Sequence, residues 1–298
     1  MVPEFKALLA TLTFILRHPL NRKTPLAALG RFLTWQLGSR LLPGAVAVPF
    51  VEDTRLIVRR GMTGATGNLY CGLHEFEDMA LLLHALRPGD LFVDIGANVG
   101  SYTVLAAGVC GAKVMALEPV PATFERLLDN LRINPIGAKV EPKHMAVGAA
   151  SGTVRFTTDL DTVNHVCTEA ETGMEVPLET LDRLLDGLFP VLIKIDVEGY
   201  ESQVVKGGLN TLGKPGLLAV LMEFNGSGMR YGHDESELLA ELLDLGFTAC
   251  VYWPFKRRIE PVSGRIVGNG NILFARDIEA LRKRVATARK ITVLGQEI

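Results

Sequence analysis

From residue 90 onward the chain alternates between short apolar runs and segments whose apolar residues recur every three or four positions. Residues 190–195 are apolar at nearly every position, which is typical of a strand buried on both faces of a parallel sheet. Between residues 119 and 134, apolar side chains recur at i, i+3, i+4 and i+7, which predicts an amphipathic helix. The same reasoning predicts a helix over 234–245 and strands over 92–95, 113–119, 139–145, 190–195, 217–223, 247–252 and 271–276.

This order of elements predicts an α/β fold with a doubly wound, Rossmann-like sheet of seven strands. We expect the sheet to be mostly parallel and to be closed by an antiparallel pair that includes the last strand. A chain of 298 residues, 48% of them hydrophobic, is long enough for one such domain with an N-terminal extension. We place the extension at residues 1–75 and the α/β domain at residues 76–298.

The extension has a pattern of its own. Residues 5–17 and 25–42 predict helices, and residues 46–51 and 54–59 predict a β-hairpin. Four glycines between residues 61 and 72 argue against a regular helix or strand there, so we expect an irregular segment in which Tyr70, His74 and Glu75 cover the binding site. Basic residues alternate with apolar ones in the helices, which suits contact with a membrane surface. We favour the alternative, an arm that packs on the domain or on a second subunit of a homo-oligomer.

Composition narrows the class of protein. A formal net charge of -2 gives no general footprint for nucleic acid. The four cysteines are scattered, with no C-x-x-C pair, so neither zinc nor a disulfide framework is indicated, and a reducing, cytoplasmic setting is expected. The apolar run near the N-terminus is too short to span a bilayer and lacks a small-residue cleavage site, so we expect no signal peptide.

The turn after the first predicted strand carries the most informative motif. The strand ends in Asp94, and a Gly-x-Asn-x-Gly turn of Gly96, Asn98 and Gly100 follows. A dinucleotide fingerprint requires glycine where this chain has Asn98 and Ser101, because the backbone there approaches the pyrophosphate. A nucleoside donor without phosphate has no such requirement. The motif therefore favours S-adenosylmethionine, and we expect Asp94, Gly96, Asn98 and Gly100 to bind it.

Two further strand ends complete the predicted donor site. Glu118 follows the second strand, 22 positions after Gly96, where an acidic residue binds ribose hydroxyls in nucleotide-binding folds. The alternative for Glu118 is a carboxylate that only caps the next helix. The end of the third strand usually supplies the wall against adenine, which makes Met145 and Ala146, beside His144, candidates for that role.

Three carboxyl groups are expected at neighbouring strand ends, where a methyl acceptor would lie. Asp196 follows the strand over 190–195, Glu198 is two residues further on, and Glu223 ends the next strand. Methyl transfer to a hydroxyl needs a general base or a metal ion. In one mechanism Asp196 or Glu198 is the base; in the other, Asp196, Glu223 and Asn225 hold a divalent cation such as Mg²⁺. Acids at 198 and 201 also suit a helix start, so a structural role for Glu198 stays open.

These motifs together resemble the FkbM family of S-adenosylmethionine-dependent methyltransferases. The resemblance spans residues 90–276, and the run Asp196-Val197-Glu198-Gly199-Tyr200-Glu201 is its most specific part. It implies O-methylation of hydroxyl groups on sugars or secondary metabolites and does not fix one acceptor. The other matching segments are Asp94–Gly100, Glu118-Pro119, Leu181-Asp182, Lys194-Ile195 and Glu223.

Two other functions compete with this one. A methyltransferase acting on nucleic acid is the first, supported by the basic cluster Lys256-Arg257-Arg258 beside aromatic residues. The Asn/Asp-Pro-Pro-Tyr run that amino-methylating enzymes of that kind often carry is replaced here by Asp-Val-Glu-Gly, so we expect a small-molecule or glycan acceptor and no nucleic acid. The second is a non-catalytic module that binds S-adenosylmethionine.

Overall fold

A computed structural model describes residues 3–41, 43–158, 164–169, 171–263 and 270–298. Within these residues eight strands form one sheet in the order β12-β11-β13-β10-β9-β3-β4-β5. The five strands from β10 to β5 are parallel, whereas β13 is antiparallel to β10, β11 to β13 and β12 to β11. The strands are β3 Leu91–Ile95, β4 Lys113–Leu117, β5 Val140–Lys143, β9 Pro190–Ile195, β10 Ala219–Phe224, β11 Thr248–Trp253, β12 Arg258–Pro261 and β13 Gly270–Ala275.

The predicted fold class is confirmed: all seven expected strands are present, and β11 and β13 form the expected antiparallel closing pair. The eighth strand, β12, was missed. It has the sequence Arg-Ile-Glu-Pro and lies at the edge of the sheet, where a strand buries few side chains and its apolar pattern is therefore weak.

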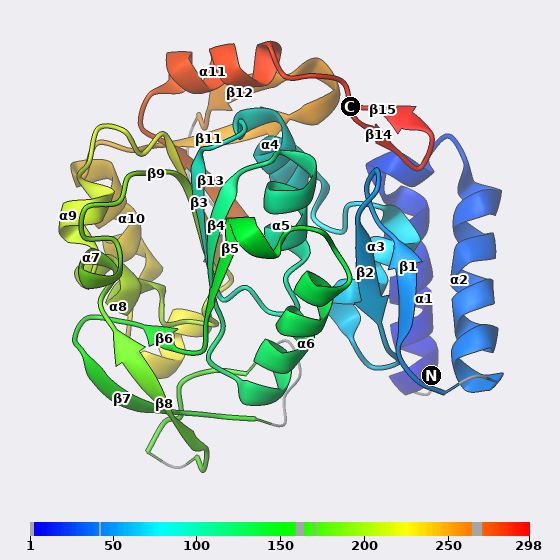
Figure 1. Ribbon diagram of the computed structural model, residues 1–298, viewed down its shortest axis with the longest axis horizontal. Coiled ribbons are helices and arrows are strands. Elements are labelled where there is room, and N and C mark those ends of the chain that lie inside the picture. The colour runs from blue at the N-terminus through cyan, green and yellow to red at the C-terminus, as the bar shows by residue number, and fades with distance from the viewer. Residues whose placement is uncertain (1–2, 42, 159–163, 170, 264–269) are drawn as a thin grey trace.

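Helices cover both faces of the sheet, as Figure 1 shows. Alternate residues of a strand face opposite sides, so Phe92 packs with α4 and α6, whereas Val93 packs with α8 and α10. One side holds α4 Phe76–Ala85, α5 Ser101–Val104 with the π-helical turn Leu105–Val109, α6 Pro121–Arg132 and α11 Ile278–Ala286. The other holds α7 Leu181–Leu184, α8 Glu201–Lys206, α9 Leu209–Leu212 and α10 Glu235–Asp244.

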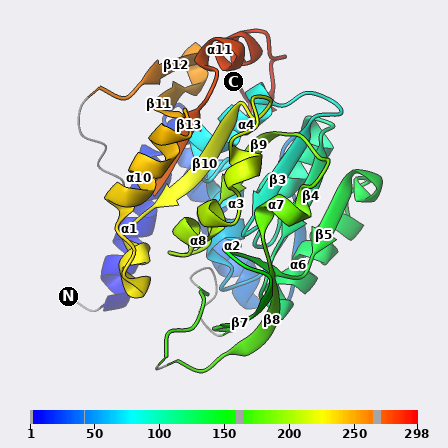
Figure 2. The ribbon, with the colours of Figure 1, turned by 90° about the vertical axis from the view of Figure 1, so that its left-hand side faces the viewer.

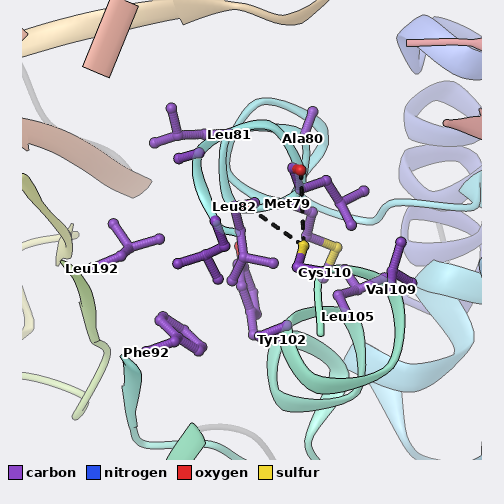
Figure 3. Close-up of a cluster of buried hydrophobic side chains, with 14 of the residues drawn as sticks. Met79, Ala80, Leu81, Leu82, Phe92, Tyr102, Leu105, Val109, Cys110 and Leu192 are labelled. Carbon is purple, nitrogen blue, oxygen red and sulfur yellow. Dashed lines mark hydrogen bonds between the residues drawn. The ribbon is translucent and has the colours of Figure 1, made fainter. Parts of the chain in front are cut away.

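The core on the first side is closely packed around α4. Figure 3 shows Met79 and Leu82 of α4 against Leu105 and Val109, with Phe92 of β3 beneath them. The thiol of Cys110 lies 3.8 Å from the carbonyl oxygen of Leu82, so this cysteine is buried as part of the core. All four cysteines are free thiols.

A second, small sheet projects from the end of the central sheet at which the parallel strands finish (Figure 2). It contains β6 Ala146–Val147, β8 Met174–Glu179 and β7 Gly152–Phe156, in that order. Residues Gly152 to Phe156 of β7 pair with β8 in antiparallel register. The predicted third strand ends early: β5 stops at Lys143, and Ala146 belongs to the second sheet.

The described residues up to Val58 form a helical arm and a hairpin, as predicted. The arm consists of α1 Pro3–Arg17 and α2 Pro25–Leu41, and the hairpin of β1 Val46–Pro49 and β2 Arg55–Val58. The expected helix end at residue 42 lies outside the described residues. The arm packs on the domain through Ile15, Phe32 and Trp35, which supports the packing role that the sequence favoured. The division between residues 75 and 76 stays a prediction.

The prediction of an irregular segment after the hairpin was wrong. Residues Thr63–Cys71 form a regular helix, α3, in spite of two internal glycines. A Cβ atom on Gly67 would overlap the ring of His74, so the glycine is there because the chain folds back closely upon the helix. Tertiary packing has overridden helix propensity.

The remaining elements are short. They are the 3₁₀ turns at Pro19–Asn21, Gly137–Lys139, Ser227–Tyr231 and Pro254–Lys256, and the C-terminal strands β14 Thr292–Val293 and β15 Gln296–Glu297. Among the described helices, none is both long and apolar enough to cross a membrane.

Candidate functional site

The turn after β3 has the geometry that its residue types require. Gly96 has φ +78°, and a Cβ atom there would overlap the backbone oxygen of Asp196, so the turn approaches the end of β9 too closely for any other residue. Asn98 also has a positive φ, 50°, a conformation that asparagine tolerates better than most residues. Asp94 is buried and accepts a hydrogen bond from Oγ1 of Thr103 at 2.6 Å, while its Oδ1 has no partner among the residues that the structure describes.

Glu118 connects this turn to the end of β4. Its Oε2 accepts the backbone N–H of Asn98 at 2.9 Å, and its Oε1 accepts that of Val120 at 2.9 Å. Burial raises the pKa of Glu118 to about 7. The capping role and the binding role are therefore compatible, because each oxygen keeps a second lone pair for a ligand.

A cavity of about 250 Å³ lies at this edge of the sheet. Its volume is close to the lower end of the range for small-molecule sites, about 300–1,000 Å³. Most of the predicted site residues line it, from both the donor and the acceptor groups. These are Asp94, Gly96, Asn98, Glu118, Asp196, Glu198 and Glu223.

The three predicted acceptor-side carboxyl groups come together. One oxygen each of Asp196, Glu198 and Glu223 lies within 4.8 Å of the others. Burial, and then repulsion from Asp196 and Glu198, raises the pKa of Glu223 to about 9. Its buried Oε2 has no hydrogen-bond partner within the described part of the chain. Burial and the charge of Asp196 raise the pKa of Glu198 to about 7. At neutral pH Glu223 is therefore mainly protonated, and Glu198 is close to half ionised.

A buried lysine beside these acids was given no role by the sequence analysis. Nζ of Lys194 lies 2.6 Å from Oδ2 of Asp196 and 4.9 Å from the centre of the Tyr102 ring. Burial by itself lowers the pKa of Lys194, but Asp196, Glu75 and Asp94 raise it by more than burial lowers it. The net pKa lies above its ordinary value, so the ammonium stays charged. A lysine inside the otherwise apolar run of β9 was the available signal, because a buried charge needs a counter-ion.

The segment before α4 covers the cavity from the arm side. His74 and Glu75 line it, as predicted, whereas Tyr70 does not and instead packs on Phe32. Glu75 accepts hydrogen bonds from the hydroxyl of Tyr102 at 2.8 Å and from Nδ2 of Asn271 at 3.1 Å. Sequence reasoning missed Asn271, which comes from β13 and is distant in the chain from the motifs.

Other predicted site residues lie away from the cavity walls. Met145 and Ala146 do not line it, because the chain leaves the central sheet after Lys143, and Phe156 of β7 lines the cavity instead. Gly100 lies behind the turn, where a Cβ atom would overlap the side chain of Leu127. Asn225 is exposed, and its Oδ1 accepts the N–H of Ser227 at 2.8 Å.

The basic cluster after β11 has structural partners. Arg257 donates to the backbone oxygens of Arg289 and Ile298, both at 2.9 Å, and so fastens the C-terminal segment to the domain. Arg258 pairs with Glu260, and Nζ of Lys256 lies 5.7 Å from the ring centre of Trp253. These contacts weaken the interpretation of the cluster as a nucleic-acid surface.

Comparison with known proteins gives two curated relatives of part of the chain. Over 146 residues it is 32% identical to the hexuronic acid methyltransferase AglP of Haloferax volcanii, a match that covers 46% of this chain and 58% of AglP. Over 85 residues it is 35% identical to the 31-O-demethyl-FK506 methyltransferase FkbM of Streptomyces tacrolimicus, covering 28% of this chain and 32% of that protein. The matches thus span less than two thirds of either relative.

Solved structures and one family model also match. The crystal structure of methyltransferase FkbM from Methylobacillus flagellatus superimposes with a TM-score of 0.42 at 14% identity, over 84% of this chain and 60% of that one. The methyltransferase FkbM domain matches residues 94–249, which is more than half of the chain and contains the turn after β3, Glu118 and the three carboxyl groups. The chain belongs to the FkbM methyltransferase domain family.

Proposed function

We propose that this protein transfers the methyl group of S-adenosylmethionine to a hydroxyl group of a sugar, a glycan or a secondary metabolite. The main support for the proposal is that residues predicted for the donor and for the acceptor line one cavity. The glycine turn and Glu118, which suit a nucleoside, and the carboxyl cluster, which suits a hydroxyl that must lose its proton, line the same space. Positioning donor and acceptor in one enclosed site is most of what methyl transfer requires.

The residues present suit the donor. Asp94 lines the cavity, and its buried Oδ1, which no described residue contacts by a hydrogen bond, would bind the ammonium of the donor's amino-acid part. Glu118 would accept the two ribose hydroxyls with its free lone pairs. When bound, the donor supplies a methyl group made electrophilic by the sulfonium.

On the acceptor side we propose Glu198 as the general base. Its pKa of about 7 is close to the working pH, where a general base is most effective. Asp196 is already paired with the ammonium of Lys194 through its Oδ2, which suits it to orienting the acceptor. Glu223, protonated at neutral pH, would donate a hydrogen bond to an acceptor oxygen.

A divalent cation held by Asp196, Glu198 and Glu223 is the alternative mechanism. The closeness of three carboxyl oxygens, within 4.8 Å of one another, favours it. Oxygen ligands of this kind suit Mg²⁺, which would lower the pKa of a coordinated hydroxyl. The ammonium of Lys194 already supplies a positive charge next to the cluster, and for that reason we place the general base first.

The acceptor class is supported by the chemistry of the site and by the relatives. Carboxylates and amides on the cavity wall accept hydrogen bonds from hydroxyls, and the two curated relatives carry the names of a hexuronic acid and a 31-O-demethyl-FK506 methyltransferase. Cytoplasmic location is part of the proposal because all four cysteines are free thiols.

The test is a transfer assay with radiolabelled S-adenosylmethionine. Glycans, nucleotide sugars, polyhydroxylated metabolites and oligonucleotides are offered as acceptors, with either EDTA or Mg²⁺. Label in a carbohydrate or metabolite that is released by cleavage of a methyl ether supports the proposal; transfer to oligonucleotides alone contradicts it. Loss of turnover in EDTA, restored by Mg²⁺, selects the cation mechanism. Donor binding without transfer to any acceptor indicates a non-catalytic module.

A further inference from the structure

The outer face of α2 is apolar, and none of the described residues covers it. Leu26, Leu33, Leu37 and Leu41 are spaced at seven and four residues, which places them on one side of the helix. Their exposed fractions are 82%, 56%, 64% and 79%, so they are far more exposed than leucines usually are. The opposite side, with Phe32 and Trp35, is the one that packs on the domain. A helix that is apolar on both sides is expected to be covered on both.

The neighbouring helix α1 also carries exposed leucines. Leu8, Leu9 and Leu16 are exposed to 43%, 44% and 38%, although Ile15 of the same helix is fully buried. Figure 1 shows α1 and α2 side by side at the edge of the molecule, away from the central sheet. We call these seven leucines, together with the exposed basic residues Lys6, Arg17, Arg22, Lys23 and Arg40, the arm surface. Exposed apolar surface of this extent marks an interaction site.

The charges of the arm indicate what covers it. Residues 5–51 contain six basic residues and no acidic residue, so their formal charge is +6, whereas the whole chain has -2 and the remainder therefore has -8. Arg17, Arg22 and Lys23 are exposed at the α1–α2 connection. A second copy of the same surface would bring like charges together, which disfavours a symmetric dimer through this face.

We infer that the arm surface binds an anionic lipid bilayer, with the leucines in the outer part of the acyl region and the basic residues at the headgroups. Exposed leucines combined with basic residues are the composition of helices that lie in the membrane interface. Anionic lipid attracts basic side chains within a Debye length, so the binding should weaken as salt is raised. This inference does not depend on the proposed methyl transfer.

The experiment is sedimentation of the full chain with vesicles of phosphatidylcholine alone or mixed with phosphatidylglycerol. The protein should bind the mixed vesicles at low salt, bind the neutral ones weakly, and be released by high salt. The double variant Leu33→Gln/Leu37→Gln should bind at least about tenfold more weakly, because two exposed leucines lose their apolar contact. Arg22→Glu/Lys23→Glu should also lose at least about tenfold, since each basic residue contributes about fivefold.

Matched controls lie outside the arm. Leu243→Gln on α10 changes a leucine exposed to 45%, and Lys283→Glu changes an exposed lysine on α11; both should bind as the unaltered protein does. Circular dichroism checks that the variants fold. Absence of binding to anionic vesicles at low salt overturns the inference, as does equal loss in the controls. A dimer, seen by light scattering, that Leu33→Gln/Leu37→Gln dissociates would instead identify a second copy as the partner.

Discussion

The ammonium of Lys194 and the carboxylate of Asp196 form an ion pair at the carboxyl end of β9, with Nζ and Oδ2 2.6 Å apart. The lysine side chain is only 4% exposed. A buried charge is tolerated only when it is paired, so the acids around this ammonium and the ammonium itself stabilise one another. The pair therefore links the stability of the central sheet to the chemistry of the carboxyl cluster.

Replacing Lys194 by methionine should destabilise the protein. The change keeps most of the side-chain volume but leaves Asp196 beside other carboxyl groups without a cation, which costs about 3 kcal/mol. Urea unfolding at pH 7 measures the free energy of unfolding. Lys206→Met, a change of an exposed lysine on α8, is the control and should alter it by less than about 0.5 kcal/mol. Equal values for the two variants would show that the ion pair has no net effect.

Turnover should depend on pH through Glu198. A general base works in its deprotonated form, and the pKa of Glu198 is raised to about 7, so kcat should rise with pH below 7 and level off above it. Glu198→Gln should lower kcat by about 100-fold or more and abolish the rise. Glu237→Gln, an exposed change on α10, should leave the profile unaltered. A rise that persists in Glu198→Gln would transfer the role of base to another group, first of all Asp196.

Binding of the donor should depend on Glu118. The change Glu118→Gln removes a charged acceptor from the proposed ribose site, and hydrogen bonds to charged groups contribute about 1.5–3 kcal/mol, so Kd for S-adenosylmethionine should increase by at least tenfold. Titration calorimetry measures it. Glu125→Gln on the exposed side of α6 should bind as tightly as the unaltered chain. Unchanged affinity in Glu118→Gln would leave this residue with its capping role only.

Two glycines in helices should respond to alanine in opposite ways. At Gly30 in α2 an added methyl group meets no atom within 4 Å, so Gly30→Ala should stabilise the protein by about 0.5–1 kcal/mol through helix propensity. At Gly67 in α3 the methyl group would overlap the ring of His74, and Gly67→Ala should destabilise it by about 1–3 kcal/mol. Thermal unfolding distinguishes the two. A stabilising Gly67→Ala would mean that His74 moves aside freely.

Much of the site was predictable because the motifs are local in the chain. The turn from Asp94 to Asn98 and the acid Glu118 follow directly after strands, and adjacent parallel strands end at the same edge of a sheet. The strand ends at Asp196 and Glu223 are brought together for the same reason, since β9 and β10 are parallel neighbours. Their roles in catalysis and metal binding stay predictions.

Contacts between distant segments were not predictable in this way. The sequence of α3 argues against a helix, and only the close approach of His74 explains why position 67 is a glycine. Phe156 reaches the cavity because β7 pairs with β8 in a second sheet, and that pairing has no local signal. The candidates Met145 and Ala146 were displaced for the same reason.

The sequence by itself determined seven strands of the central sheet, their order along the chain and the chemical groups at their ends, because apolar periodicity and turn residues act over a few positions. Only the tertiary structure decided that Lys194 neutralises Asp196, that Asn271 of β13 binds Glu75, and that the leucines of α2 face outward. Each of these features depends on which surfaces meet when the elements pack. Burial arises only from that packing, and burial in turn shifts the pKa values of the site.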